Sequence, residues 1–284
     1  MIKFFANIFG FFLNYIYQLV GNYGVAIIIF SIIVKIILLP ISIKQQKTMK
    51  KTAKIQGKIK EIQEKYKNNP EKLNQETMDL YKKENMSPFS GCLGAIVQII
   101  LLFAVFYLVR SPLTYMKKID SEIIERYTQE IQEEDSSNKT YPEISIIKNK
   151  GNEDETVYVN MNFLGLDLSE IPLQDSKNIR VFIIPALYVM TTFISMKINS
   201  TNTKKKSENK LITDGREENN EEKKDENNQN PIEDASKSMT YFMPIMSVSI
   251  ALIAPLGLAL YWLINNVLMI VERIILSKVI KEEE

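Results

Sequence analysis

One lysine stands inside a long apolar run of this sequence. Lys35 lies in IIIFSIIVKIILLP, and Ser31 precedes it by four residues, which places both side chains on one face of a helix. A cation that faces lipid costs several kcal/mol unless it reaches the interface, pairs with an anion or meets water. Either the side chain snorkels over the roughly 9 Å to the end of the run at Ile41, or it belongs to a hydrated site.

Further polar residues interrupt two later apolar runs of the chain. They are Gln98 in one run and Asn265, Asn266 and Glu272 in the other. Polar groups at this depth are tolerated when they face one another or trapped water. Their distribution predicts one shared, hydrated groove that also contains Ser31 and Lys35.

The residue types that are missing exclude several kinds of catalytic site. The chain has no histidine, which excludes Ser-His-Asp and Cys-His catalysis and the usual histidine-containing zinc sites. The single cysteine, Cys92, begins an apolar run, where a small buried hydrophobe is the expected role. A Ser31–Lys35 protease would also need an oxyanion hole and a substrate path, and nothing in the sequence indicates them. We therefore predict neither an enzyme nor a metal site.

Nucleotides and nucleic acids are not favoured as ligands. The sequence contains no glycine-rich phosphate loop, so it gives no basis for ATP as an energy source. Its basic segment lacks the interleaved aromatic residues that bind single-stranded nucleic acid. We expect no cofactor and no nucleic-acid readout.

The polar residues must be positioned by membrane-spanning helices. Strongly apolar and strongly polar blocks alternate, although the mean hydropathy is only −0.09. A span needs about 20 apolar residues, and the sequence contains five candidate runs: 23–41, 92–109, 181–196, 239–253 and 256–276. The third and fourth are short, which implies tilt, a thinned bilayer or a hairpin. Ala254-Pro255 separates the last two runs, and we expect these runs to form a helical hairpin. The predicted fold is an all-α integral membrane protein with five transmembrane helices around a hydrophilic groove.

Residues 1–22 favour a helix that lies in the membrane interface. Phe5, Ile8, Phe9 and Phe12 share one face of that helix, and the polar residues Asn7, Asn14 and Gln18 lie off that face. A sixth crossing is the less favoured alternative. The segment resembles a signal peptide, but no A-x-A site follows it, so we expect it to be retained.

The distribution of lysine predicts the orientation in the membrane. Residues 42–87 contain twelve lysines against six acidic residues, whereas residues 111–178 contain seven basic residues against fourteen acidic ones. Because cytoplasmic loops carry an excess of lysine and arginine, we expect 42–88 in the cytoplasm and the acidic loop 111–178 outside. A disordered cytoplasmic linker, 197–238, and a cytoplasmic tail, 277–284, follow from alternation. The predicted protein is a multi-pass plasma-membrane protein with its N-terminus outside and its C-terminus inside.

The basic segment 42–88 is predicted to form a helical hairpin, because Asn68-Asn69-Pro70 interrupts its helical pattern. Its first arm has only a thin apolar stripe among many lysines, which suits a mobile hairpin above an anionic membrane surface. A merely solvated cytosolic loop is the alternative.

Four blocks of the sequence together resemble one known family. They are GNYGVAIIIFSIIVKIILLPISIKQQKTMKK, IQEKYKNNPEKLNQETMDLYKKENMSPFSGCLGAIVQI, FLGLDLS, and MTYFMPIMSVSIALIAPLGLALYWLINNVLMIVERIIL. They are similar to the YidC/Oxa/Alb family of membrane protein insertases. The resemblance covers most of the chain outside two polar insertions, and the combination of blocks is specific.

The resemblance implies a groove that is open to the cytoplasm and to lipid, in which a cation of the first span attracts the acidic tail of a client protein. Lys35 occupies the position of that cation, where family members mostly carry arginine. Because lysine lacks the planar fork of arginine, the strength of the attraction is open. The groove would also contain Gln98, Tyr261, Trp262, Asn265 and Asn266, although Trp262 could equally pack in the core or anchor an interface.

The resemblance further implies partners. Nascent membrane proteins would be the clients, and the cytoplasmic hairpin would receive them. The hairpin residues expected to do so are Lys50, Lys51, Lys54, Lys58, Tyr66 and Pro70. The ending KEEE lacks the long basic tail that some relatives are thought to use for ribosomes, which argues against ribosome docking. A Sec translocon remains an open partner.

Two other classes of function remain as alternatives. A transporter or channel would also place polar residues inside spans, but the sequence shows no inverted repeat. A membrane anchor that presents its loops as a docking scaffold would tolerate loss of Lys35 but not of the hairpin. An insertase predicts that both changes weaken client insertion.

Overall fold

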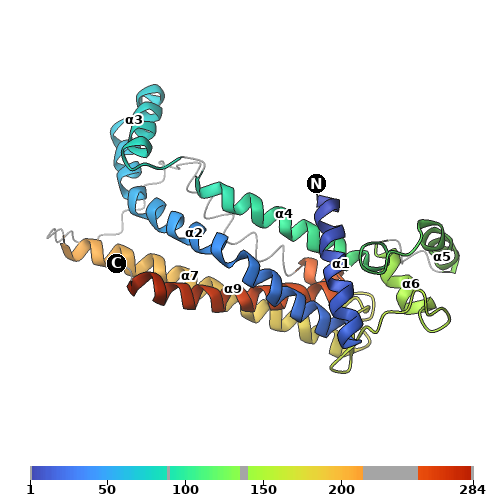
Figure 1. Ribbon diagram of the computed structural model, residues 1–284. Helices are drawn as coiled ribbons and strands as arrows, with labels where there is room; N and C mark the ends of the chain where they lie inside the picture. Colours follow the sequence, from blue (N-terminus) through green and yellow to red (C-terminus); the bar gives the residue numbers. More distant parts are fainter. Residues whose placement is uncertain (1, 88–89, 135–139, 214–248, 283–284) are drawn as a thin grey trace.

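The computed structural model describes residues 2–87, 90–134, 140–213 and 249–282, and its regular secondary structure is helical apart from one short β-hairpin. Side chains are described in these ranges except at 49, 53–54, 56, 90–98, 134, 199–213 and 277–282. Four long helices run side by side (Figure 1). They are α2 (Tyr23–Lys65), α4 (Ser90–Arg110), α7 (Ile183–Thr213) and α9 (Leu256–Glu282).

These helices have the length and composition of membrane spans. Within the described residues, the stretches Tyr23–Thr52, Ile179–Ile198 and Leu256–Leu276 are long and apolar enough to cross a bilayer, and Ile99–Arg110 is a shorter apolar helix. The chain is therefore a helical, multi-pass membrane protein. Most of the predicted run 239–253 lies outside the described residues, and its last five residues are helical.

Helix α2 continues beyond the expected end of the first span. Its 43 residues run without interruption through Pro40, whereas the sequence predicted a span to Ile41 and a separate arm after it. A proline removes one backbone hydrogen bond, and membrane helices tolerate that loss. The chain turns only near Asn69, whose side chain accepts a hydrogen bond from the backbone N–H of Lys72. Helix α3 (Pro70–Lys83) then packs back against α2.

Helix α1 (Ile2–Val20) lies across one end of the bundle (Figure 1). The buried face presents small and aliphatic residues to α2, α4 and the turn after α4: Ala6, Gly10, Leu13 and Ile16. The opposite face leaves large apolar side chains exposed: Phe4, Phe11, Phe12, Tyr15 and Leu19. A helix with one packed face and one exposed apolar face suits a position in the membrane interface.

The acidic segment 111–178 forms a folded cap at the same end of the bundle. In its described parts it contains the π-helical turn η1 (Leu113–Lys117), α5 (Ser121–Glu134), α6 (Pro142–Lys150) and a hairpin of β1 (Asn162–Phe163) and β2 (Leu166–Asp167). Its apolar residues share a core that includes Ile131, Ile144, Ile146, Ile147 and Val157. The sequence predicted only an acidic loop here.

Backbone hydrogen bonds attach the cap to the starts of two long helices. The carbonyls of Glu170 and Leu168 accept from the N–H groups of Leu256 and Gly257, both at 2.9 Å. These N–H groups begin α9 and have no partner within the helix. At the start of α2, a Cβ on Gly24 would lie 2.6 Å from the ring of Phe163, so only glycine allows the hairpin to pack so closely. The segment FLGLDLS and Glu170, which follows it, thus pack against the starts of α2 and α9.

Glu143 is a buried carboxylate in this cap, with 5% of its surface exposed. Its two oxygens accept hydrogen bonds from the backbone N–H of Thr114, at 2.9 Å, and from the hydroxyl of the same residue, at 2.7 Å. Burial raises its pKa, while these hydrogen bonds act in the opposite direction. Glu143 therefore connects α6 to η1 through two hydrogen bonds, and removing its carboxylate from water opposes this stabilisation.

We expect Glu143→Ala to destabilise the cap by about 1–3 kcal/mol, because the substitution removes both hydrogen bonds. The sign of the pH dependence follows from the raised pKa. The stability linked to Glu143 is fully present below the ordinary pKa of glutamate and is lost as the pH rises through the raised value. Thermal unfolding at several pH values should show wild type losing stability, relative to Glu143→Gln, as the pH rises. An identical pH dependence in both proteins would contradict this account.

Candidate functional site

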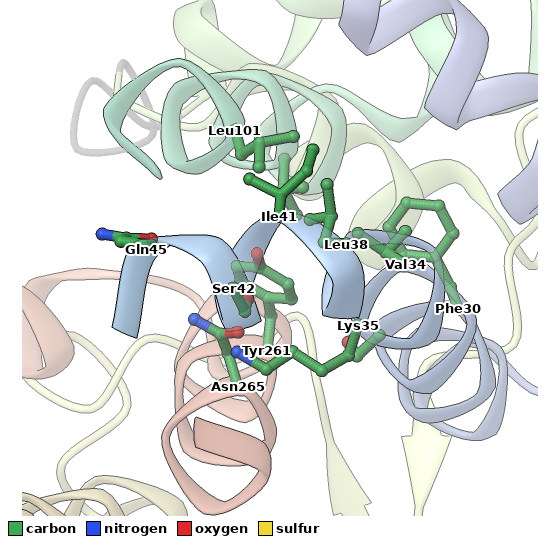
Figure 2. A pocket seen from close by; sticks show the side chains of 12 residues that line it. Phe30, Val34, Lys35, Leu38, Ile41, Ser42, Gln45, Leu101, Tyr261 and Asn265 are labelled. Atoms are coloured by element: carbon green, nitrogen blue, oxygen red, sulfur yellow. The ribbon is translucent and has the colours of Figure 1, made fainter. Parts of the chain in front are cut away.

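A pocket of about 620 Å³, part of which is open to the surroundings, lies between α2, α4 and α9. Figure 2 shows its lining side chains, most of them from α2. Helix α2 contributes Phe30, Ser31, Val34, Lys35, Leu38, Ile41, Ser42 and Gln45; α4 contributes Leu101 and Val105; α9 contributes Tyr261 and Asn265. The three helices are far apart in sequence, so the pocket exists only in the packed bundle.

The polar residues of α2 form a stripe along this pocket. Ser31, Lys35, Ser42 and Gln45 recur at spacings that keep them on one helical face. On α9, Tyr261 and Asn265 are four residues apart and share a face in the same way. The pocket therefore combines an aliphatic wall with a line of polar groups parallel to α2.

The charge at the centre of this stripe is paired. The ammonium of Lys35 lies 2.6 Å from a carboxylate oxygen of Glu272 on α9, and their side chains are only 20% and 9% exposed. Figure 2 shows Lys35 extending from α2 toward α9. The other oxygen of Glu272, Oε1, is buried and has no hydrogen-bond partner among the described residues. Lys35 thus reaches an anion on a neighbouring helix.

Ser31 is buried, and its hydroxyl donates to the carbonyl of Ile27 at 2.7 Å. The Ser31 hydroxyl therefore donates to the backbone of its own helix, while the Lys35 ammonium pairs with Glu272. A serine nucleophile needs a base that accepts its proton. The contacts of Ser31 and Lys35 favour a polar lining over a Ser-Lys catalytic pair.

Trp262 and Asn266 lie on a different face of α9 from Tyr261 and Asn265. The side-chain nitrogen of Asn266 donates to the hydroxyls of Thr191 and Thr192 on α7, at 3.2 and 3.0 Å. The ring of Trp262 lies 6.2 Å from that of Tyr188, also on α7. Neither residue lines the pocket, in contrast to the expectation, because one residue along a helix turns the side chain by about 100°.

Sequence reasoning did not single out Ser42 and Gln45, which extend the polar stripe of α2. The sequence feature that could have identified them is their spacing of seven and ten residues from Lys35, because this spacing places them on the same face of the helix. The sequence shows Glu272 as a polar residue in an apolar run, but it does not indicate the pairing with Lys35. The side chain of Gln98, another expected groove residue, lies outside the described residues.

Helix α2 continues beyond its last pocket residue, Gln45, and α3 follows it (Figure 1). The predicted hairpin residues lie in this part of the chain. Lys58 pairs with Glu84 at 2.7 Å. The ring of Tyr66 lies close to the ammonium groups of Lys65 and Lys72, and Pro70 occupies the first turn of α3.

The other predicted hairpin residues, Lys50, Lys51 and Lys54, lie on α2 between the pocket and the hairpin turn. The side chain of Lys51 is exposed, and that of Lys54 lies outside the described side chains.

A comparison with protein-family models matches residues 15–283 to the family described as 60Kd inner membrane protein. The match includes α2, α4, α7 and α9, and therefore the three helices that form the pocket. It begins within α1.

Curated relatives are similar over different lengths. A Fusobacterium nucleatum protein named membrane protein insertase YidC is 26% identical over 95% of this chain and 93% of its own length. A Treponema denticola protein of the same name is 26% identical over 97% of this chain, but this chain spans 38% of its length. A Helicobacter pylori protein, again of that name, is 48% identical over 106 residues, which are 37% of this chain and 19% of that protein.

Proposed function

Since the chain belongs to the 60Kd inner membrane protein family, we propose that it is a membrane protein insertase that works through the pocket beside Lys35. Its relatives bear the name membrane protein insertase, so the family supports membrane protein insertion as the function. The observation that carries the proposal is a lysine in the wall of a polar pocket between apolar helices. Its clients are nascent membrane proteins in the lipid bilayer.

The proposed topology has five transmembrane helices around a hydrophilic groove. Residues 23–41, 92–109, 181–196, 239–253 and 256–276 are the spans, and the pocket is the described part of the groove. The lysine-rich hairpin is cytoplasmic and the acidic cap lies outside. The protein is then located in the plasma membrane. Its N-terminus lies outside the cell and its C-terminus lies in the cytoplasm. The charge difference between segments 42–87 and 111–178 supports it.

The transfer free energies indicate that the groove lowers the barrier for moving the client's polar tail across the membrane. The driving force for insertion comes from the client's apolar span. An aspartate at the centre of a membrane helix costs about 3 kcal/mol, whereas each leucine or isoleucine contributes about −0.3 to −0.6 kcal/mol. A client span of roughly 20 apolar residues therefore outweighs one acidic residue in its tail. Water and the Lys35 ammonium reduce the cost while the tail crosses. No nucleotide hydrolysis is needed for this step.

Reconstitution of the purified protein in liposomes tests the function. A single-span client with one aspartate in its translocated tail is added, and protease protection of the tail is measured. We expect protection several-fold above that in empty liposomes, because the pocket lowers the barrier for the polar tail. Protection no higher than in empty liposomes would contradict the proposal.

Two controls separate the alternatives to an insertase. Efflux of a trapped solute without client protection would favour a channel. A deletion of the hairpin, residues 47–83, and the substitution Lys35→Leu are tested as two separate variants. A scaffold should lose function only in the deletion variant, whereas an insertase should lose function in both. Because no Sec translocon is included, insertion in this system also shows whether the protein acts alone.

A further inference from the structure

We propose that Glu272 is an internal competitor for the client, which holds the Lys35 ammonium at rest and is displaced when an acidic client tail enters the pocket. The inference rests on the proposed insertase function. It assigns Glu272 a role in specificity: the carboxylate sets how strongly acidic tails are preferred over neutral ones.

The first observation is the position of the pair. The cation and its partner come from different helices: Lys35 is in the pocket wall on α2, whereas Glu272 reaches it from α9, two helical turns beyond the pocket residue Asn265. The contact of 2.6 Å satisfies the ammonium with a carboxylate, the same group that an acidic client tail would offer. A client carboxylate must therefore compete with Glu272 for one cation.

The second observation is that the pair is incompletely satisfied. A buried ion pair is firmly held only when further hydrogen bonds satisfy its remaining polar atoms. Oε1 of Glu272 is buried without a hydrogen-bond partner among the described residues. The Lys35 side chain keeps 20% exposure against 9% for Glu272, so the cation is the more accessible member. The arrangement favours exchange of the partner of Lys35 over a permanent tie between α2 and α9.

The third observation concerns charge selectivity. A neutral tail offers no anion, so it would have to leave Lys35 and Glu272 paired or leave both without a partner. Leaving a buried charge unpaired is strongly unfavourable. A neutral tail therefore leaves the pair intact, whereas an acidic tail gains the cation only by displacing Glu272. The competitor thus reduces the advantage of acidic tails over neutral ones.

Glu272→Gln tests the inference in liposomes with two clients that differ only by aspartate or asparagine in the tail. Removing the competitor should raise the ratio of aspartate-tail to asparagine-tail insertion by about two- to fivefold, the range for one partly accessible charge pair. Glu130→Gln is the matched control, because it removes the carboxylate that lies 3.6 Å from Lys150 in the cap. That control should leave the ratio unchanged.

The failures of the two proposals are distinguishable. An unchanged or lowered ratio for Glu272→Gln, with wild type still inserting clients, overturns the competitor role and leaves the insertase function standing. Wild type that inserts no better than empty liposomes overturns the proposed function and this inference with it.

A second measurement needs no variant and remains informative if Glu272→Gln does not fold. A membrane-permeant carbodiimide joins the Lys35 amine to the Glu272 carboxylate as an amide, and the water that is lost converts the carbodiimide to a urea. The linked peptides are quantified by mass spectrometry. Saturation with the aspartate-tail client should lower the yield of the link, and the asparagine-tail client should not. An equal yield with both clients would overturn the inference.

Discussion

Replacement of Lys35 with leucine is expected to reduce insertion of an aspartate-tail client at least about tenfold and to destabilise the protein by about 3 kcal/mol. The first effect follows from loss of the cation, since an unpaired carboxylate in the membrane costs more than the roughly 1.4 kcal/mol that corresponds to a tenfold change. The second effect follows because Glu272 would keep its buried charge without a partner. Protease protection in liposomes and thermal unfolding in detergent measure the two effects separately.

Two further variants keep the effects apart. Lys35→Arg retains the charge and should insert the client at a rate close to wild type, because a guanidinium can also bind the carboxylate. The double substitution Lys35→Leu/Glu272→Leu removes both charges, so it should recover most of the lost stability but not the lost insertion. Recovery of insertion in this double variant would show that Lys35 does not attract clients.

Replacement of Gly10 with valine should detach α1 from the rest of the protein. A Cβ at this position would overlap the backbone carbonyl of Tyr115 in η1, and a carbonyl in a packed turn cannot move aside as a flexible side chain can. Overpacking of this kind typically costs 1–3 kcal/mol and sometimes more, and here about 3 kcal/mol is expected. Hydrogen exchange of the α1 amides should accelerate while the amides of α7 stay protected.

Phe11→Val is the matched control for this prediction. Phe11 is adjacent to Gly10 but 68% exposed, so the same β-branched residue introduced there meets no backbone. Unchanged exchange in Gly10→Val, or equal acceleration in both variants, would show that α1 does not depend on the close approach to Tyr115.

The sequence identified the helices that matter because long apolar runs and helical spacing are local properties. Lys35 and Ser31 on one face of a span, and Asn265 in the last span, follow from composition and period alone. The structure places these three residues in the lining of one pocket. Their function in insertion stays a prediction.

What could not be predicted depends on packing between distant segments. Lys35 and Glu272 are more than two hundred residues apart in the chain, so nothing local indicates that they pair. Asn265 and Asn266 are adjacent residues of the same type, so the sequence does not indicate which of them faces the pocket. The rotation of α9 against α7 decides this. The core of the cap could not be predicted from the acidic sequence, because its apolar residues are spread among charged ones in short helices and loops.

Site-specific photocrosslinking during insertion tests whether the client's polar tail passes through the pocket beside Lys35. A photoreactive phenylalanine analogue replaces Leu101, which lines the pocket, or Met190, which is 60% exposed on α7 and does not. We expect the translocated tail of an aspartate-tail client to crosslink to position 101 and not to position 190. Crosslinking at position 190 with none at position 101 would contradict this prediction.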